Sequence, residues 1–197
     1  MITPLLSQEE NLFDFFHEAV GSAVSTAGGQ VSDNGIYYLS NLLVERGRTS
    51  ELVLPQTLVE LQIKAMECGG TEAVQAWREL GDRALYVSGF FRSSLARKNV
   101  SVEYYQAMGA TAYDHLASLM RWTGVSGGFE DIYEELAHQF QHCSTVIRRV
   151  RAQVRKHSDA DILKLYEEWI MNPDSVVTEQ LNELGVDPFR LKEDMGC

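Results

Sequence analysis

The sequence predicts an all-α protein, a single-domain helical bundle of about eight helices. Apolar residues recur at steps of three and four along most of the chain, which is the period of an amphipathic helix. Capping residues and glycine pairs separate these stretches, and no stretch alternates apolar and polar residues as a strand does. With 197 residues, of which 45% are hydrophobic, the chain can bury a sizeable core.

Two helices are expected in the first fifty residues. Ser7 and Glu10 form a capping box at the start of the first helix, and Gly28-Gly29 ends it. The apolar face of this helix is broad, so we expect the helix to be mostly buried. The second helix spans about 32–47.

Two further helices precede a predicted break at 89–94. Pro55 suits the first turn of the third helix, which ends at Gly69-Gly70. Thr71 is the expected N-cap of the fourth helix. Two consecutive phenylalanines in the break are expected to plug the core, since exposing both rings would be costly.

The fifth and sixth helices are both long. Ser101 caps the fifth helix, whose small residues would let another helix approach closely: Ala107, Gly109, Ala110 and Ala112. The sixth is the longest predicted element, over about 129–157. Its apolar stripe advances by steps of four and three residues, a spacing that favours packing against neighbouring helices at a shallow angle.

The C-terminal part of the chain is expected to add two shorter helices. The seventh helix starts near Asp159 and is closed by Asn172-Pro173. A short eighth helix follows it. We therefore expect one α-helical domain over 1–185 and a C-terminal tail over 186–197.

Composition and cysteine usage exclude several classes of protein. The formal net charge of −11 argues against a general nucleic-acid coat protein, which needs a basic surface. No apolar run is long enough for a membrane span, and the N-terminus lacks the features of a secretory signal. Cys68, Cys143 and Cys197 form no Cys-x-x-Cys pair, a pattern typical of a reduced protein. The sequence therefore favours a cytoplasmic, acidic protein that binds neither membrane nor nucleic acid.

One cluster on the predicted sixth helix has metal-ligand spacing. Glu135 and His138 are three residues apart, as in ferritin-like di-metal sites, and His142 follows at a further step of four. Helical geometry argues against a metal there, because His138 would point about 160° and His142 about 120° away from the apolar stripe. We expect no metal and no cofactor.

A ligand pocket is a second candidate, near the break after the fourth helix and on the tyrosine-rich fifth helix. Its candidate residues are Asp82, Phe90, Tyr104, Tyr105 and His115. His115 lacks the nucleophile signature that would make it part of a catalytic site, so a structural role is favoured. In a tyrosine pair such as 37–38, neighbours on a helix point about 100° apart, so only one ring can sit squarely in the core.

The clearest asymmetry of charge lies at 148–157, which holds five of the 17 basic residues. The candidate partner- or anion-binding residues there are Arg148, Arg151, Arg155 and Lys156. They suit an acidic partner or a phosphate-bearing ligand. A solvated helix end, stabilised by the helix dipole, is the structural alternative.

Two strings in the middle of the chain carry a resemblance. LGDRALYVSGFF at 80–91 and VEYYQAMGATAY at 102–113, with YLSNLL at 38–43 before them, resemble a motif of uncharacterised bacterial all-helical proteins of similar length. The resemblance implies a bacterial helical protein. It implies no activity, cofactor or site residue.

Two functional hypotheses follow from these patterns. The first is a non-enzymatic helical interaction protein, such as a regulator, adaptor or assembly subunit, that binds a protein partner of acidic character. The alternative is a helical-bundle enzyme or small-ligand-binding protein, in its sharpest form a metal-dependent oxidase. A homo-oligomer is compatible with both, because the first and sixth helices each have apolar surface to bury between chains.

Overall fold

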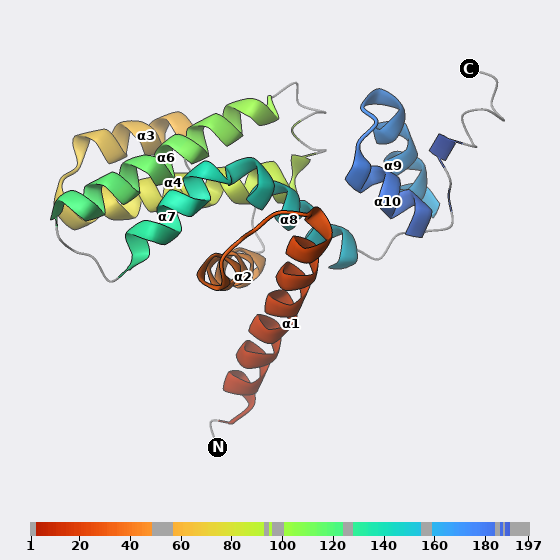
Figure 1. Cartoon of the computed structure of the whole chain (residues 1–197), viewed down its shortest axis with the longest axis horizontal. Helices are drawn as coiled ribbons and strands as arrows, with labels where there is room; N and C mark the ends of the chain where they lie inside the picture. Colours follow the sequence, from red (N-terminus) through yellow and green to blue (C-terminus); the bar gives the residue numbers. More distant parts are fainter. Residues whose placement is uncertain are drawn as a thin grey trace. The chain divides into compact units, whose positions relative to one another are not determined.

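The computed structural model of the chain describes residues 3–48, 57–92, 95, 101–123, 128–154, 159–183, 186 and 188–189. These residues form nine α-helices and no strand, which confirms the predicted all-α fold (Figure 1). No helix in the described ranges combines the length and apolar character that crossing a membrane requires.

The chain divides into two compact units, Met1–Val150 and Arg151–Cys197. Each unit has its own cluster of buried apolar side chains. The division therefore falls inside 1–185, the range that the sequence assigns to one domain. Of the predicted tail, only residues 186, 188 and 189 are described.

The first unit contains seven of the described helices. In chain order they are α1 (Thr3–Ala27), α2 (Asp33–Arg48), α3 (Leu58–Glu67), α4 (Gly70–Phe90), α6 (Val102–Thr123), α7 (Phe129–His138) and α8 (Phe140–Val154). The second unit contains α9 (Asp159–Met171) and α10 (Ser175–Glu183). The last turn of α8 extends past Val150 into the second unit.

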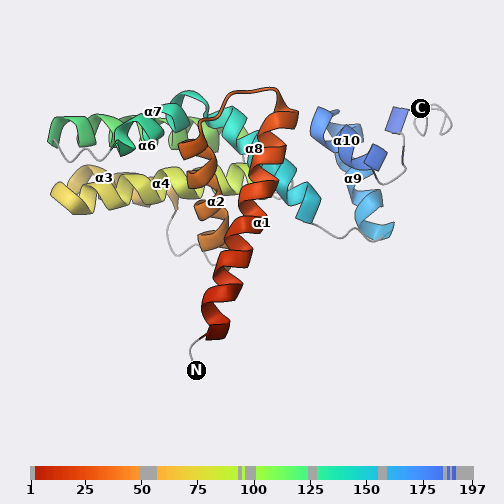
Figure 2. The ribbon, with the colours of Figure 1, turned by 60° about the horizontal axis from the view of Figure 1, so that its bottom comes forward.

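The first two helices pack against each other (Figure 2). α1 begins before Ser7, so the cap predicted at Ser7 is wrong; Pro4 suits the first helical turn, where its missing N–H would have no partner. Gly28 ends α1 as predicted, with a left-handed φ of 72°. Ser32 precedes α2, and its Oγ accepts a hydrogen bond from the Gly35 N–H at 3.0 Å, which confirms the predicted start of α2.

The start of α3 differs from the prediction. Pro55 lies outside the described residues, and α3 begins three residues later, after Thr57. Thr57 Oγ1 accepts a hydrogen bond from the Glu60 N–H at 3.2 Å, and Glu60 Oε2 accepts one from the Thr57 N–H at 2.6 Å. This capping box satisfies two backbone donors at the helix end and so determines where α3 begins.

Glycines mark both ends of α4. Its N-cap is Gly69, so the cap predicted at Thr71 is wrong and the helix starts earlier. The helix ends at Phe90, inside the predicted break. Gly89 is helical, and a Cβ there would lie 2.8 Å from the Ser144 carbonyl oxygen. The role of Gly89 is therefore to let α4 approach α8 closely rather than to free the backbone.

The single long helix predicted over 129–157 is wrong. The structure has two helices, α7 and α8, which meet at Gln139 and run in different directions (Figure 2). Gln139 has φ −105° and ψ 22°, outside helical values. The break directs Phe140 into the core, where it is 2% exposed and packs on Gly109 of α6. Residues 155–158 lie outside the described part of the chain.

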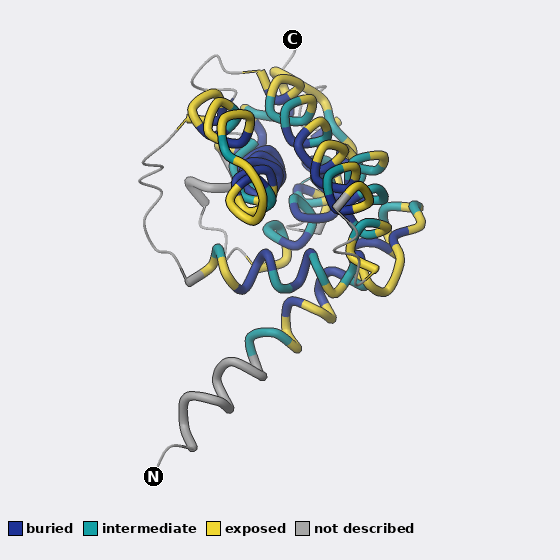
Figure 3. Tube along the Cα trace, turned by 90° about the vertical axis from the view of Figure 1, so that its left-hand side faces the viewer, coloured by how far each residue is buried: buried dark blue, intermediate teal, exposed yellow. Residues whose placement is uncertain are grey.

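The central helix of the first unit is α4, which contacts α2, α3 and α6. Every residue from Leu80 to Leu85 is buried, so all sides of this segment face other parts of the protein. The buried stretches drawn dark blue in Figure 3 lie where helices face one another. This position places two charged side chains, Asp82 and Arg83, in the interior, where each needs a partner.

The second unit is a pair of helices with a small core. The residues of this core cluster are Leu165, Tyr166, Trp169, Val177 and Leu181. The Trp169 Nε1–H donates a hydrogen bond to Thr178 Oγ1 at 2.9 Å, which joins α9 to α10. Both helices were predicted, and the predicted stop at 172–173 is confirmed.

Candidate binding site between α2 and α4

The most unusual side chain in the core is Asp82, at the middle of α4. It is 4% exposed and is the one buried carboxylate among the described residues. Two phenol groups donate hydrogen bonds to its Oδ1: Tyr38 of α2 at 2.5 Å and Tyr113 of α6 at 2.7 Å. These bonds compensate in part for removing the carboxylate from water. Asp82 thus joins three helices.

The sequence of α4 makes room for this arrangement. A Cβ at Gly81 would lie 2.5 Å from Cε1 of Tyr113, so only glycine lets that ring approach α4 this closely. Tyr133 of α7 completes the aromatic group around the carboxylate. Its ring meets the Tyr38 ring edge-on at 5.6 Å and stacks on the Tyr113 ring at 5.9 Å.

Burial dominates the acid–base properties of this group. It raises the pKa of Asp82 above its usual value, although the two tyrosine hydrogen bonds and the positive charges of Arg78 and Arg46 act in the opposite direction. Burial and the Asp82 charge also raise the pKa of both Tyr38 and Tyr113. Both phenols therefore stay protonated at neutral pH and remain donors.

Arg78 lies between this buried group and solvent. Its Nε is 3.4 Å from Asp82 Oδ2, and its Cζ lies over the Tyr38 ring, 5.8 Å from the ring centroid. Its Nη2 is 3.9 Å from Glu45 Oε2. Both distances exceed the roughly 2.7–2.9 Å of a charge-assisted hydrogen bond. The guanidinium is thus held in place by the aspartate and the ring without being saturated by short hydrogen bonds.

The neighbouring charges form a tighter group. Glu79 accepts hydrogen bonds at 2.7 Å from Arg46 Nη2 and from Arg83 Nη2, each on a different oxygen. Burial acts to raise the pKa of Glu79, but these two arginines more than offset it, so the pKa is lowered. Glu79 therefore stays ionised and ties α2 to α4.

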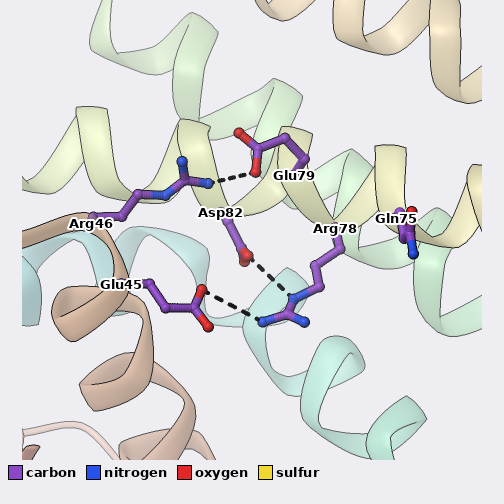
Figure 4. A pocket seen from close by; sticks show the side chains of 6 residues that line it. All are labelled: Glu45, Arg46, Gln75, Arg78, Glu79 and Asp82. Carbon is purple, nitrogen blue, oxygen red and sulfur yellow. Dashed lines mark hydrogen bonds and ion pairs between the residues drawn. The ribbon is translucent and has the colours of Figure 1, made fainter. Parts of the chain in front are cut away.

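A cavity of about 400 Å³ opens beside these side chains. Its lining residues are Glu45 and Arg46 from α2, and Gln75, Arg78, Glu79 and Asp82 from α4 (Figure 4). We call it the α2–α4 pocket. The α4 residues recur at steps of three and four and so lie along one side of that helix. Figure 4 shows Arg46 directed at Glu79, and Arg78 directed at both Asp82 and Glu45.

Of the five residues predicted to line a pocket, only Asp82 belongs to the α2–α4 pocket. Phe90 stacks on Tyr86 with ring centroids 5.1 Å apart. Tyr104 and Tyr105 meet edge-on near the start of α6, and His115 stacks on Trp77 at 4.7 Å. These residues are spread along α4 and α6, and none of them lines the α2–α4 pocket. In the tyrosine pair 37–38, one ring points inward as predicted, since Tyr37 is 58% exposed.

The three metal-ligand candidates have other surroundings. Glu135 accepts hydrogen bonds from the Ser32 N–H at 2.7 Å and from the Ser32 hydroxyl at 2.5 Å, and so caps α2 from α7. His138 is exposed. The His142 ring lies against Gly29, where a Cβ would be 2.1 Å from its Nε2. Within the described ranges, no three His, Cys, Asp or Glu side chains are grouped so that they could hold a metal ion.

The predicted basic surface is described only in part. Arg148 and Arg151 are partly buried, and each interacts with another group of the chain. Arg155 and Lys156 lie outside the described residues. Partner binding at this stretch stays a prediction.

Sequence reasoning missed most of the α2–α4 pocket. The lining residues that were not predicted are Glu45, Arg46, Gln75, Arg78 and Glu79, because their convergence depends on how α2 and α4 pack. One local signal was present, the i, i+4 pair of Arg78 and Asp82 on α4.

Comparisons with known protein families, with curated proteins and with solved structures find no match for the chain.

Proposed function

We propose that the protein is a helical binding protein whose small polar ligand sits in the α2–α4 pocket. The observation that carries this proposal is the state of Arg78. A buried carboxylate and an aromatic ring hold its guanidinium at a cavity, with charge partners no closer than 3.4 Å. An arginine that is held beside a cavity, without short hydrogen bonds to charged partners, is suited to bind a ligand.

The free-energy cost of burying Asp82 supports a functional role for this residue. Replacing a buried ionic group with apolar side chains of similar volume is often neutral or stabilising, so Asp82 is not needed to form a core. Perturbed titratable groups gather at functional sites, and here the perturbed group borders a cavity. Of the two hypotheses from the sequence, the small-ligand-binding bundle therefore has the stronger support.

A ligand screen with matched variants tests the proposal. Thermal unfolding is measured for the wild type, Arg78→Ala and Arg121→Ala in the presence of a set of small polar metabolites. Arg121 is the control, because it is an exposed arginine paired with Glu134 at 2.8 Å on other helices. We expect at least one compound to raise the Tm of the wild type and of R121A but not of R78A. Equal stabilisation of all three proteins would refute the site.

A second candidate function is protein docking, and one surface favours it. Val59, Ile63 and Met66 follow each other at steps of four and three on α3, and all three are exposed. The opposite side of α3 packs against the core through Leu58 and Leu61. An exposed apolar stripe of this kind suits contact with another helix.

The docking hypothesis has its own test. Ile63→Glu places a charge at the middle of the stripe, and Gln141→Glu places one at an exposed polar position of α8. Light scattering and co-purification are compared for the two variants and the wild type. Loss of an associated chain in I63E alone supports docking through α3, while identical behaviour of both variants contradicts it.

A further inference from the structure

We infer that the ligand of the α2–α4 pocket carries an oxyanion, a carboxylate or a phosphate, which replaces Glu45 as the partner of Arg78. This inference rests on the proposed function and adds the chemical class of the ligand. It follows from a comparison of the charged side chains in the pocket: some have close partners within the protein, whereas a ligand can replace the partner of Arg78.

The terminal edge of the Arg78 guanidinium faces the more distant of its two charged partners. Asp82 lies on its Nε side at 3.4 Å, and its Cζ lies over the Tyr38 ring, 5.8 Å from the ring centroid. One terminal nitrogen, Nη2, is directed toward Glu45 (Figure 4). Two terminal N–H groups in a planar fork match the two oxygens of a carboxylate or phosphate.

Glu45 is a weak partner for that edge. Its side chain is 61% exposed, that of Arg78 is 45% exposed, and their closest atoms are 3.9 Å apart. Exposed pairs of this kind contribute little, because water screens both charges. An oxyanion that forms two short hydrogen bonds to Arg78 can therefore displace Glu45.

A ligand cannot displace the partners of the other charged side chains in the pocket as easily. Glu79 accepts 2.7 Å hydrogen bonds from two arginines, so Arg46 already has a close partner. Asp82 is buried and accepts from two tyrosines. Gln75 also lines the pocket, and its amide can donate a further hydrogen bond to the ligand. Arg78 is thus the group that selects an oxyanion.

The test follows the Nε–H signal of Arg78 by ¹⁵N NMR in the full-length protein. Inorganic phosphate, acetate and methylammonium are titrated separately at constant ionic strength. We expect a saturable shift with phosphate or acetate, and the tighter of the two identifies the class of oxyanion. Methylammonium, a cation, should leave the signal unchanged.

Two matched variants test the displacement step. Glu45→Gln removes the competing charge and should bind the preferred anion about two- to fivefold more tightly. Glu134→Gln removes an exposed carboxylate from Arg121, outside the pocket, and should bind as the wild type does. Both replaced side chains are exposed or partly exposed, so both variants should fold, which circular dichroism verifies.

Different failures overturn different statements. A shift with methylammonium and with neither anion would overturn the oxyanion class and leave the proposed pocket in place. Binding by E45Q that is no tighter than that of the wild type would overturn the displacement of Glu45. No shift of Arg78 with any of the three probes or with the metabolite set would overturn the proposed function as well.

Discussion

The replacement of Tyr113 by phenylalanine would show how strongly the buried group depends on its hydrogen bonds. Tyr113→Phe removes one of two phenol donors to Asp82 Oδ1 and leaves the ring in place against Gly81. A hydrogen bond to a charged group contributes about 1.5–3 kcal/mol, and neither side chain is solvent-exposed. We expect Y113F to lower the free energy of unfolding by about 2 kcal/mol at neutral pH.

The effect should depend on pH with a definite sign. Burial raises the pKa of Asp82 in the folded state, so the folded protein binds the proton more tightly than the unfolded chain does. The contribution of Asp82 to stability is therefore largest below its unfolded pKa and is lost as the pH rises through its folded pKa. Below that pKa the carboxyl is neutral, and the loss caused by Y113F should shrink to about 1 kcal/mol.

Urea unfolding at pH 7 and at pH 4 measures both quantities. Tyr37→Phe is the control, since Tyr37 neighbours the partly buried Tyr38 on α2 and is 58% exposed; it should change stability by less than about 0.5 kcal/mol. A Y113F effect as small as that of Y37F would refute the claim that the phenol stabilises a buried carboxylate. A larger effect at pH 4 than at pH 7 would refute the claim that the hydrogen bond to the charged form of Asp82 is the stronger one.

Three further substitutions test the packing and capping of the first unit by urea unfolding. Gly109→Ala should cost about 1–3 kcal/mol, because the new Cβ would lie 2.2 Å from the Phe140 ring; an unchanged midpoint would contradict this contact. Glu135→Ala removes the cap that α7 provides to Ser32 and should cost about 1–2 kcal/mol, with a neutral result excluding a capping role. Thr57→Ala breaks the capping box of α3 and should cost about 1 kcal/mol, whereas Thr57→Ser should be close to wild type.

Much of the fold could be predicted because its signals are local. The caps at Ser32 and Ser101 lie next to the residues that they serve: Ser101 Oγ accepts from the Tyr104 N–H at 3.3 Å. The glycine that ends α1 is likewise a local feature. Such positions can be read from the sequence without knowledge of the neighbouring helices.

The break between α7 and α8 could not be predicted in the same way. Gln139 is neither proline nor glycine, and the apolar stripe continues on both sides of it. The break is stabilised by a contact distant in sequence, in which Phe140 enters the space beside Gly109. Tertiary packing here overrides a helical pattern that is locally consistent.

The α2–α4 pocket depends on tertiary packing even more. Asp82 is the one predicted pocket residue that lines it. Its partners Tyr38 and Tyr113 are 44 and 31 residues away in sequence. No local sequence pattern predicts that these side chains converge. The i, i+4 spacing of Arg78 and Asp82, by contrast, can be seen in the sequence of α4.

The central claim is that the buried group holds Arg78 ready at the pocket, and the mobility of its Nε–H bond tests this most directly. ¹⁵N relaxation gives the order parameter of this bond in the wild type and in Asp82→Asn, with Arg121 as an exposed reference. We predict a value near that of rigid backbone, about 0.85, for Arg78 in the wild type, and one below about 0.6 in D82N. An Arg78 order parameter below about 0.6 in the wild type, or one that is equally high in D82N, would contradict the claim.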